Sequence, residues 1–255
     1  MAKKIIIFCF IILALGIFFG AKAKALNSVK SYARGYINWY IQRKWIGAKV
    51  SFANPNPDYI APPSSDPNKG PVNQTLGVIT NNGNLVYDSE THEQTQSWVE
   101  VGYTKGWATN RRDPNTYNPD IRSLYTARER PLDGIGYYDE RLSPISVGPP
   151  GTVHNYKILY DSGVWKVYID GIYDSYSSQP LYAQTIAIGL ENADSKNSSV
   201  SEVSLQNMAY YYENQGWYSF GQANPKIQIT SPDGGNYYFY YTNSTKDTAK
   251  DGMNK

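Results

Sequence analysis

Cysteine is the scarcest residue type of this chain, because Cys9 is the only one among 255 residues. It lies inside an apolar run near the start of the chain. The remainder therefore has no thiol that could form a disulfide, act as a nucleophile or bind a metal as a thiolate. Stability must come from the core and the sheet hydrogen bonds alone, and a chain of this length can bury a sufficient core.

Histidine is nearly as rare, with only His92 and His154 in the sequence. Two histidines cannot build a three-histidine zinc site, and neither stands at ligand spacing from the other or from a carboxylate. The chain also lacks a Gly-x-Ser-x-Gly nucleophile motif, a phosphate-binding loop and a dinucleotide fingerprint. We therefore expect no cofactor and no metal, and any chemistry would rest on carboxylates.

The first 25 residues have the pattern of a secretory signal peptide. Lys3 and Lys4 precede an apolar run at residues 5–19, and two Ala-x-Ala sites follow at 21–23 and 23–25. The run is short for a membrane span. We expect cleavage, a secreted product and no stable membrane insertion of the mature chain; the alternative is an uncleaved anchor.

The small positive charge of the whole chain belongs to this signal. The sequence has 24 Lys and Arg against 22 Asp and Glu, and four of the lysines lie in the signal, which leaves 20 basic residues after cleavage. A slightly acidic mature chain is a poor partner for nucleic acid. We therefore expect no nucleic-acid binding.

The apolar pattern after residue 46 has a period of two, which predicts an all-β fold of antiparallel sheets. The strands are expected at residues 48–53, 75–80, 97–104, 122–128, 155–161, 164–171, 184–191, 200–213, 226–230 and 237–242. The clearest hairpin spans residues 155–171, where two alternating segments flank Asp-Ser-Gly. Residues 26–46 show weak helical periodicity and are predicted as an N-terminal extension. Residues 47–242 are predicted as one β-sandwich domain and 243–255 as a flexible tail.

Two of these strands carry a glutamate on their polar face. In residues 97–104 the core phase is Val99, Val101 and Tyr103, which places Glu100 beside Trp98 and Gly102 on the opposite phase. In residues 184–191 the same alternation places Glu191 with two small residues, Ala187 and Gly189. If the two strands are neighbours, they form a groove with a small floor, left open at Gly102, and a glutamate pair. The alternative is that both glutamates simply face water.

The segment around Glu100 resembles a motif of the neprosin family of glutamic peptidases. It reads WVEVGY at 98–103, and YNPD at 117–120 and RSLY at 122–125 follow it. The neprosin pattern has a glutamate in an Ile-Glu-Ala-Gly-Trp type strand, then a Tyr-Gly-Asp turn and an Arg-Leu-Phe strand. GLEN at 189–192 is similar to the segment that carries the family's second glutamate.

The resemblance implies a secreted acid endopeptidase of peptide or protein substrates, with Glu100 and Glu191 as the catalytic pair. Two close carboxylates titrate in coupled steps and share one proton at acid pH. Glu191 would be the general base. Glu100 would donate a hydrogen bond to the oxyanion, because the related eqolisins have a glutamine there. Trp98 is predicted to line the substrate groove, or else to pack on the sheet surface.

A second resemblance competes with the first. Residues 163–171, GVWKVYIDG, are similar to a hairpin of concanavalin-type and laminin-G-like domains. Glutamic peptidases share that concanavalin A-like jelly-roll sandwich, so this motif predicts the fold without choosing the function. The alternative function is a non-catalytic sandwich that binds a carbohydrate or a surface. The 24 tyrosines suit the stacking of sugars as well as they suit a peptide groove.

Overall fold

A computed structural model gives the arrangement of most of the chain after residue 30. It describes residues 31–38, 44–55, 57–58, 72–80, 86–88, 93–95, 97–108, 117–132, 135–177, 182–192, 199–231 and 235–254. The predicted signal peptide lies outside these residues, and its cleavage stays a prediction. Within the described part of the chain, no helix is both long enough and apolar enough to cross a bilayer.

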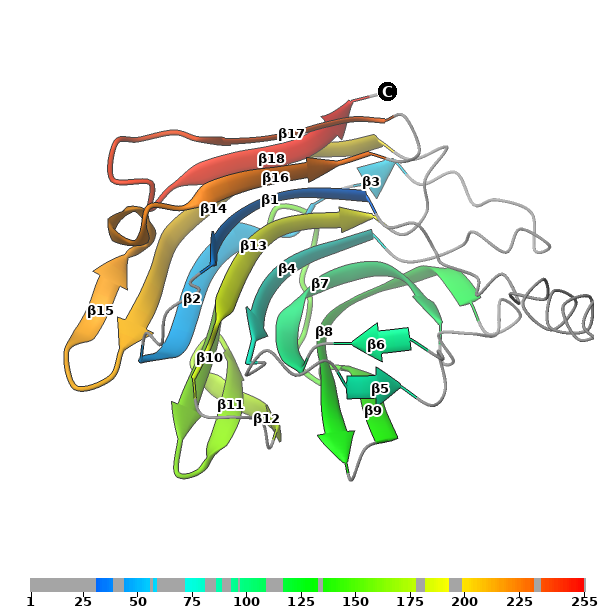
Figure 1. Ribbon diagram of the computed structural model, residues 1–255. Coiled ribbons are helices and arrows are strands. Elements are labelled where there is room, and N and C mark those ends of the chain that lie inside the picture. The colour runs from blue at the N-terminus through cyan, green and yellow to red at the C-terminus, as the bar shows by residue number, and fades with distance from the viewer. Residues whose placement is uncertain are drawn as a thin grey trace, which may run out of the picture.

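Two antiparallel sheets lie face to face and make the fold an all-β jelly-roll sandwich, as the sequence predicts (Figure 1). The seven-stranded sheet has the order β16 (Lys226–Thr230), β1 (Ser31–Asn38), β13 (Thr185–Asn192), β4 (Val72–Ile79), β7 (Trp98–Ala108), β8 (Tyr117–Leu132) and β9 (Ile135–Leu142). The nine-stranded sheet has the order β12 (Ile172–Ser177), β11 (Val164–Ile169), β10 (Val153–Asp161), β2 (Trp45–Ala53), β14 (Ser199–Tyr212), β18 (Ala249–Asn254) and β17 (Asn236–Tyr241). Its remaining strands, β15 (Gly216–Ser219) and β3 (Pro57–Asp58), pair with β14.

Smaller elements complete the described fold. β5 (Val86–Asp88) and β6 (Glu93–Thr95) form a separate two-stranded sheet, and a 3-10 helix, η2 (Phe220–Ala223), follows β15.

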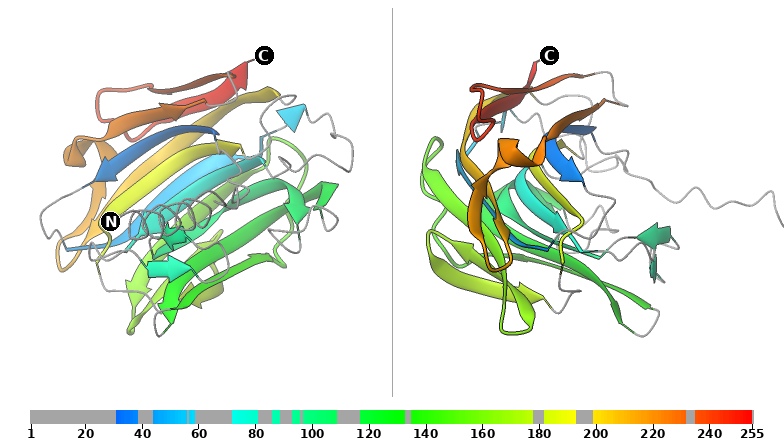
Figure 2. Two further views of the ribbon diagram at one scale, coloured as in Figure 1. Left: turned by 45° about the vertical axis from the view of Figure 1, so that its right-hand side comes forward. Right: turned by 60° about the vertical axis from the view of Figure 1, so that its left-hand side comes forward.

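The seven-stranded sheet is bowed, and its concave face is turned away from the other sheet (Figure 2). Side chains on that face are therefore outside the main core.

The main core lies between the two sheets. Each strand contributes alternate side chains to it, because successive residues of a strand point to opposite faces. Six residues that the alternation assigns to the core are all buried in a single cluster: Val99, Val101, Trp165, Val167, Ile186 and Ile188. The strand phases predicted from the sequence are confirmed at these positions.

The hairpin predicted at residues 155–171 is confirmed as β10 and β11. Ser162 and Gly163 both have positive φ, at 54° and 86°. This conformation at both turn residues suits a two-residue hairpin whose twist matches its strands. Asp170 and Gly171 repeat it at the next turn, with φ values of 51° and 79°.

The helical expectation for residues 26–46 is wrong where the structure describes them, because residues 31–38 form β1 inside the seven-stranded sheet. Its inward residues include Ala33 and Gly35, which are too small to give a clear apolar alternation. Gly35 is small for a packing reason: a Cβ atom there would lie 2.6 Å from the Phe239 ring. The inward positions of β1 are therefore too small for a hydrophobicity pattern to identify the strand.

The flexible tail predicted at residues 243–255 is also wrong, because β18 lies between β14 and β17 in the nine-stranded sheet. Its buried positions include Asp251 and Gly252, which do not resemble core residues in the sequence. The sandwich thus extends beyond the predicted limits of 47 and 242 at both ends, to Ser31 and Asn254 among the described residues.

Candidate functional site

The concave face of the seven-stranded sheet contains both glutamates singled out in the sequence. Register places Tyr36, Ala187, Gly77 and Glu100 in one row across β1, β13, β4 and β7. The neighbouring row is Arg34, Gly189, Thr75, Gly102 and Tyr125. In both rows small residues on the middle strands lie between large side chains from β1 and from β7 or β8. We call this part of the concave face, with small residues in the middle and large side chains on both sides, the trough.

The floor of the trough has room for a side-chain carbon at Gly77. A Cβ atom added there would have its nearest neighbours at 3.8 Å, in the Glu100 carboxylate, and at 3.9 Å, in the Ala187 carbonyl. The open position expected at Gly102 is wrong: a Cβ atom there would lie 2.0 Å from the Gln74 carbonyl oxygen. Gly102 is therefore required by the close approach of β4, whereas Gly77 leaves space.

Glu100 and Glu191 share the concave face, as their strand phases predict, but their strands are not neighbours. β4 lies between β7 and β13. Glu100 is in the row of Ala187, so Glu191 is four positions further along β13. This offset amounts to about 13 Å along the strands and about 10 Å across them. The pair therefore flanks the trough diagonally instead of meeting over adjacent strands.

Tyr125 of β8 contacts Glu100 of the neighbouring strand β7. Its side chain is fully buried, and its hydroxyl donates a hydrogen bond to Oε1 of Glu100. Burial raises the pKa of Tyr125 well above its ordinary value, and the nearby Glu100 and Glu191 carboxylates raise it further. The phenol consequently stays protonated and remains a hydrogen-bond donor to Glu100.

Glu191 is almost buried and stands directly opposite Tyr32 of β1. The Arg34 guanidinium lies over the Tyr32 ring, 4.2 Å from its centroid, and Arg34 Nε donates to Gln228 Oε1 at 2.8 Å. A guanidinium has five N–H groups, so Arg34 keeps donors beyond that bond. Tyr32, Arg34 and Tyr36 were missed in the sequence because β1 was not recognised, although their period of two was present.

Trp98 is half-buried and packs against a small apolar cluster on the concave side of β7 and β8. The cluster consists of Tyr125 and Ala127, with Ile121 and Leu142 beside them. The indole therefore supports the buried phenol that contacts Glu100. Its predicted part in substrate binding stays a prediction.

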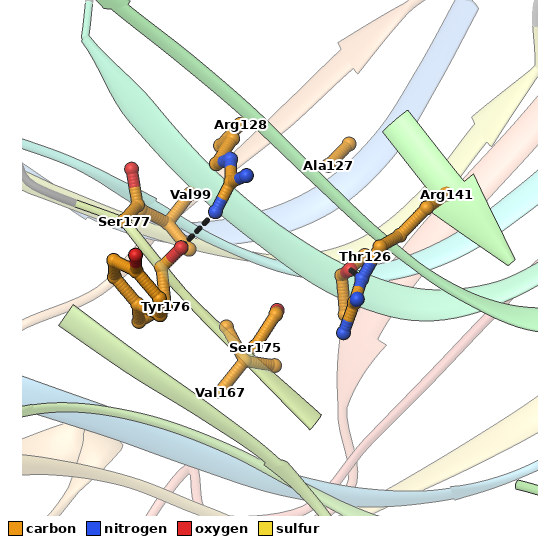
Figure 3. A pocket seen from close by; sticks show the side chains of 9 residues that line it. All are labelled: Val99, Thr126, Ala127, Arg128, Arg141, Val167, Ser175, Tyr176 and Ser177. Atoms are coloured by element: carbon orange, nitrogen blue, oxygen red, sulfur yellow. Dashed lines mark hydrogen bonds between the residues drawn. The ribbon is translucent and has the colours of Figure 1, made fainter. Parts of the chain in front are cut away.

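A small space lies at the sandwich edge, between β8, β9 and β12 (Figure 3). Two arginines extend across it from the seven-stranded sheet. Arg128 donates to the Tyr176 carbonyl, and Arg141 pairs with the buried Asp174 carboxylate at 3.0 Å. Ser143 Oγ donates to the other oxygen of Asp174 at 2.6 Å. These bonds hold edge strand β12 against β8 and β9. The residues around this space therefore have a structural role.

Within the residues that the structure describes, no three His, Cys, Asp or Glu side chains come together as a metal site. His154 has a structural environment instead. Its Nδ1 lies 2.6 Å from Asp170 Oδ2 and its Nε2 lies 3.0 Å from the Val147 carbonyl. It joins the segment before β10 to the turn after β11.

No protein-family model matches the chain, and no curated protein matches it. Solved structures do resemble it. Sheep galectin-11 in complex with glycerol is 11% identical with a TM-score of 0.32, over 67% of this chain and 95% of the galectin. A Bacillus licheniformis β-glucanase is 11% identical with a TM-score of 0.30, over 88% and 76% of the two chains. The carbohydrate-binding module CBM66 from Bacillus subtilis is 11% identical with a TM-score of 0.30, over 69% and 80%.

These likenesses concern the sandwich fold alone. A likeness of fold does not assign a function. The function of this chain has to be argued from its own site.

Proposed function

We propose that this protein is a carbohydrate-binding sandwich that holds an extended neutral sugar chain in the trough of the concave face. The observation that supports the proposal most directly is the arrangement of the two rows. Small residues at Gly77, Ala187 and Gly189 form a floor, and aromatic and hydrogen-bonding side chains stand on both sides. From Tyr36 on β1 to Glu100 on β7 the trough spans three strand spacings, about 14 Å.

The position of the trough in the sheet favours a sugar over a peptide. Peptides that bind sheets commonly add a strand at an exposed edge, where main-chain groups are available. The trough lies over β13 and β4, which both have paired neighbours on each side. A ligand there must be recognised by side chains, and a sugar offers hydroxyl groups for them and a C–H face for aromatic rings.

The side chains around the trough supply both kinds of contact. Tyr32 and Tyr36 are half-buried and so present part of each ring. Arg34, held by Gln228, supplies donors, and Glu100, held by Tyr125, supplies an acceptor. Groups that are already oriented lose little entropy when the ligand binds.

The test is to fill the trough floor and measure binding. Gly77→Val places a β-branched side chain on the trough floor, where its Cβ atom makes only ordinary contacts with Glu100 and Ala187. The strand should therefore form while a bound chain is displaced. We expect at least a tenfold loss of affinity in calorimetric titrations against neutral oligosaccharides of four or more sugars. Ser204→Val, on the outer face of β14, introduces the same valine side chain away from the trough and should bind as the wild type does. No binding of any neutral oligosaccharide by the folded wild type would refute the proposal.

A second candidate, the glutamic peptidase, is favoured by one observation: Glu100 and Glu191 share the face, and both act on the Tyr125 phenol. The same proteins distinguish the two functions. A peptidase should hydrolyse an unfolded protein between about pH 2 and 7 with an acid optimum. Glu191→Gln should then abolish turnover, while Glu100→Gln should keep part of it. If neither wild type nor variants cleave, the binding function stands alone.

A further inference from the structure

The outer face of the nine-stranded sheet places two lysines on neighbouring strands. Lys49 of β2 and Lys157 of β10 stand directly opposite each other in the antiparallel register. Like charges in that position destabilise a sheet. Among the described residues, neither lysine forms a salt bridge, whereas Lys166 and Lys250 on the same face pair with Asp161 and Glu202 at 2.5 Å.

Each of the two lysines lies over an aromatic ring. Lys157 Nζ is 4.1 Å from the centroid of Tyr168, and Lys49 Nζ is 4.6 Å from that of Trp217. A second ring supports each of these, because Tyr168 meets Tyr173 edge to face at 6.0 Å and Trp217 meets Tyr211 at 5.1 Å. The two charges are thus flanked by rings from β11 on one side and β15 on the other.

A shallow hollow with a polar floor lies beside the lysine pair. Its lining includes Lys49, Lys157, Ser51, Asn155 and Asn207. Ser51 Oγ donates to Asn155 Oδ1 at 2.7 Å, and Asn207 Nδ2 donates to Ser51 Oγ at 3.2 Å. Asn207 sits at a β-bulge of β14 with a φ of 56°, an uncommon conformation that often marks a functional position.

Asp170, on the turn that follows β11, already has partners. Asp170 Oδ2 lies 2.6 Å from His154 Nδ1, and Asp170 Oδ1 accepts the Asn155 backbone N–H at 2.8 Å. It also accepts a long 3.4 Å bond from Asn155 Nδ2. The hollow therefore combines two cations, amide and hydroxyl groups, and flanking rings.

We infer that this lysine hollow is a second binding site, specific for the acidic sugars of an anionic polysaccharide. A carboxylate or sulfate group between Lys49 and Lys157 would relieve their mutual repulsion. The floor amides and hydroxyl would bind sugar hydroxyl groups, and the exposed parts of Trp217 and Tyr168 would contact C–H faces. The site lies on the opposite face of the sandwich from the trough and does not depend on it.

The test compares dextran sulfate and polygalacturonate with neutral dextran of the same chain length, in titrations at low and high salt. Wild type should bind both acidic polymers, more weakly as salt increases, and should bind neutral dextran at least tenfold more weakly at this site. The double variant K49Q/K157Q should lose at least tenfold in affinity for the acidic polymers. Gly77→Val should leave this affinity unchanged, which separates failure of this site from failure of the trough.

The matched control is K166Q/K250Q, which removes the same net charge from the same face but takes paired lysines. We expect less than a twofold change in its affinity. Equal losses in the two double variants would show general charge attraction and overturn the site. Trp217→Ala should weaken polygalacturonate binding, because it removes a ring that contacts the sugar, but it should not weaken polyphosphate binding. Binding of a single-stranded DNA oligomer as tight as that of the acidic polysaccharides would overturn the preference for sugars.

Discussion

Asp251 is a single acidic residue enclosed between the two sheets. Its side chain is fully buried in β18, and Oδ2 accepts a 2.7 Å hydrogen bond from Gln74 of the facing sheet. Burial raises its pKa to about 8, although the bonds from Gln74 and from the Leu190 backbone oppose the rise. The folded protein therefore favours the neutral carboxyl up to mildly alkaline pH.

The raised pKa predicts how stability depends on pH. A group whose folded pKa lies above its unfolded value stabilises the fold at low pH, and this contribution is lost as pH rises through the folded pKa. The free energy of unfolding should fall between about pH 4 and 8, by at most about 1.4 kcal/mol per pH unit. Asp251→Asn keeps a hydrogen-bond acceptor without the charge, so urea titrations of this variant should show a flatter profile. Asp161→Asn, on an exposed turn, should retain the wild-type slope; equal slopes in wild type and Asp251→Asn would contradict the assignment.

At the scale of elements, β18 connects the edge strand β17 to the rest of the nine-stranded sheet. It pairs with β14 on one side and β17 on the other. Polar contacts between the sheets gather here, since Asn192 of β13 donates to the Tyr237 hydroxyl at 2.9 Å beside the Asp251–Gln74 bond. Both bonds join β18 or β17 to the facing sheet, and both depend on the relative position of the two sheets. They therefore help to specify how the sheets fit together.

A pair of neighbouring substitutions tests whether residues 249–254 are part of the core. Met253 is 4% exposed and packs in the main cluster, whereas Asn254 is the next residue and points to the outside. Met253→Ala should lower the free energy of unfolding by about 2–5 kcal/mol, because it leaves a cavity. Asn254→Ala should change it by less than about 0.5 kcal/mol. Similar small effects for both, measured by chemical unfolding, would restore the flexible-tail interpretation.

At the scale of the whole molecule, the two proposed sites use opposite faces of one sandwich. Each lies on the outward side chains of a different sheet, while the inward side chains build a common core. A protein of this kind could hold a neutral chain on one face and an acidic chain on the other.

Export is the prediction that concerns the whole chain. A charged start, a short apolar run and Ala-x-Ala sites predict a mature protein that begins near Leu26. Mass spectrometry of the culture medium should detect peptides from residue 26 onward. Peptides from residues 1–19 in the exported protein would contradict cleavage and favour the uncleaved anchor.

The sequence by itself determined the properties that depend on local alternation and on composition. The phases of the strands around Val99 and Ile186 follow from a period of two, and they place Glu100 and Glu191 on one face. The hairpin of β10 and β11 follows from its turn residues. The absence of cysteine from the chain after Cys9 required a stability based on packing, whatever the topology.

Only the tertiary structure decided which strands are neighbours. β4 enters between β7 and β13, which separates the two glutamates, and β1 joins the sheet to bring Arg34 and Tyr36 to the trough. The opposition of Lys49 and Lys157 likewise joins residues 108 positions apart in the chain. The physical reason is that a strand's side-chain phase is set by its own residues, whereas its partners and register are set by contacts with distant segments.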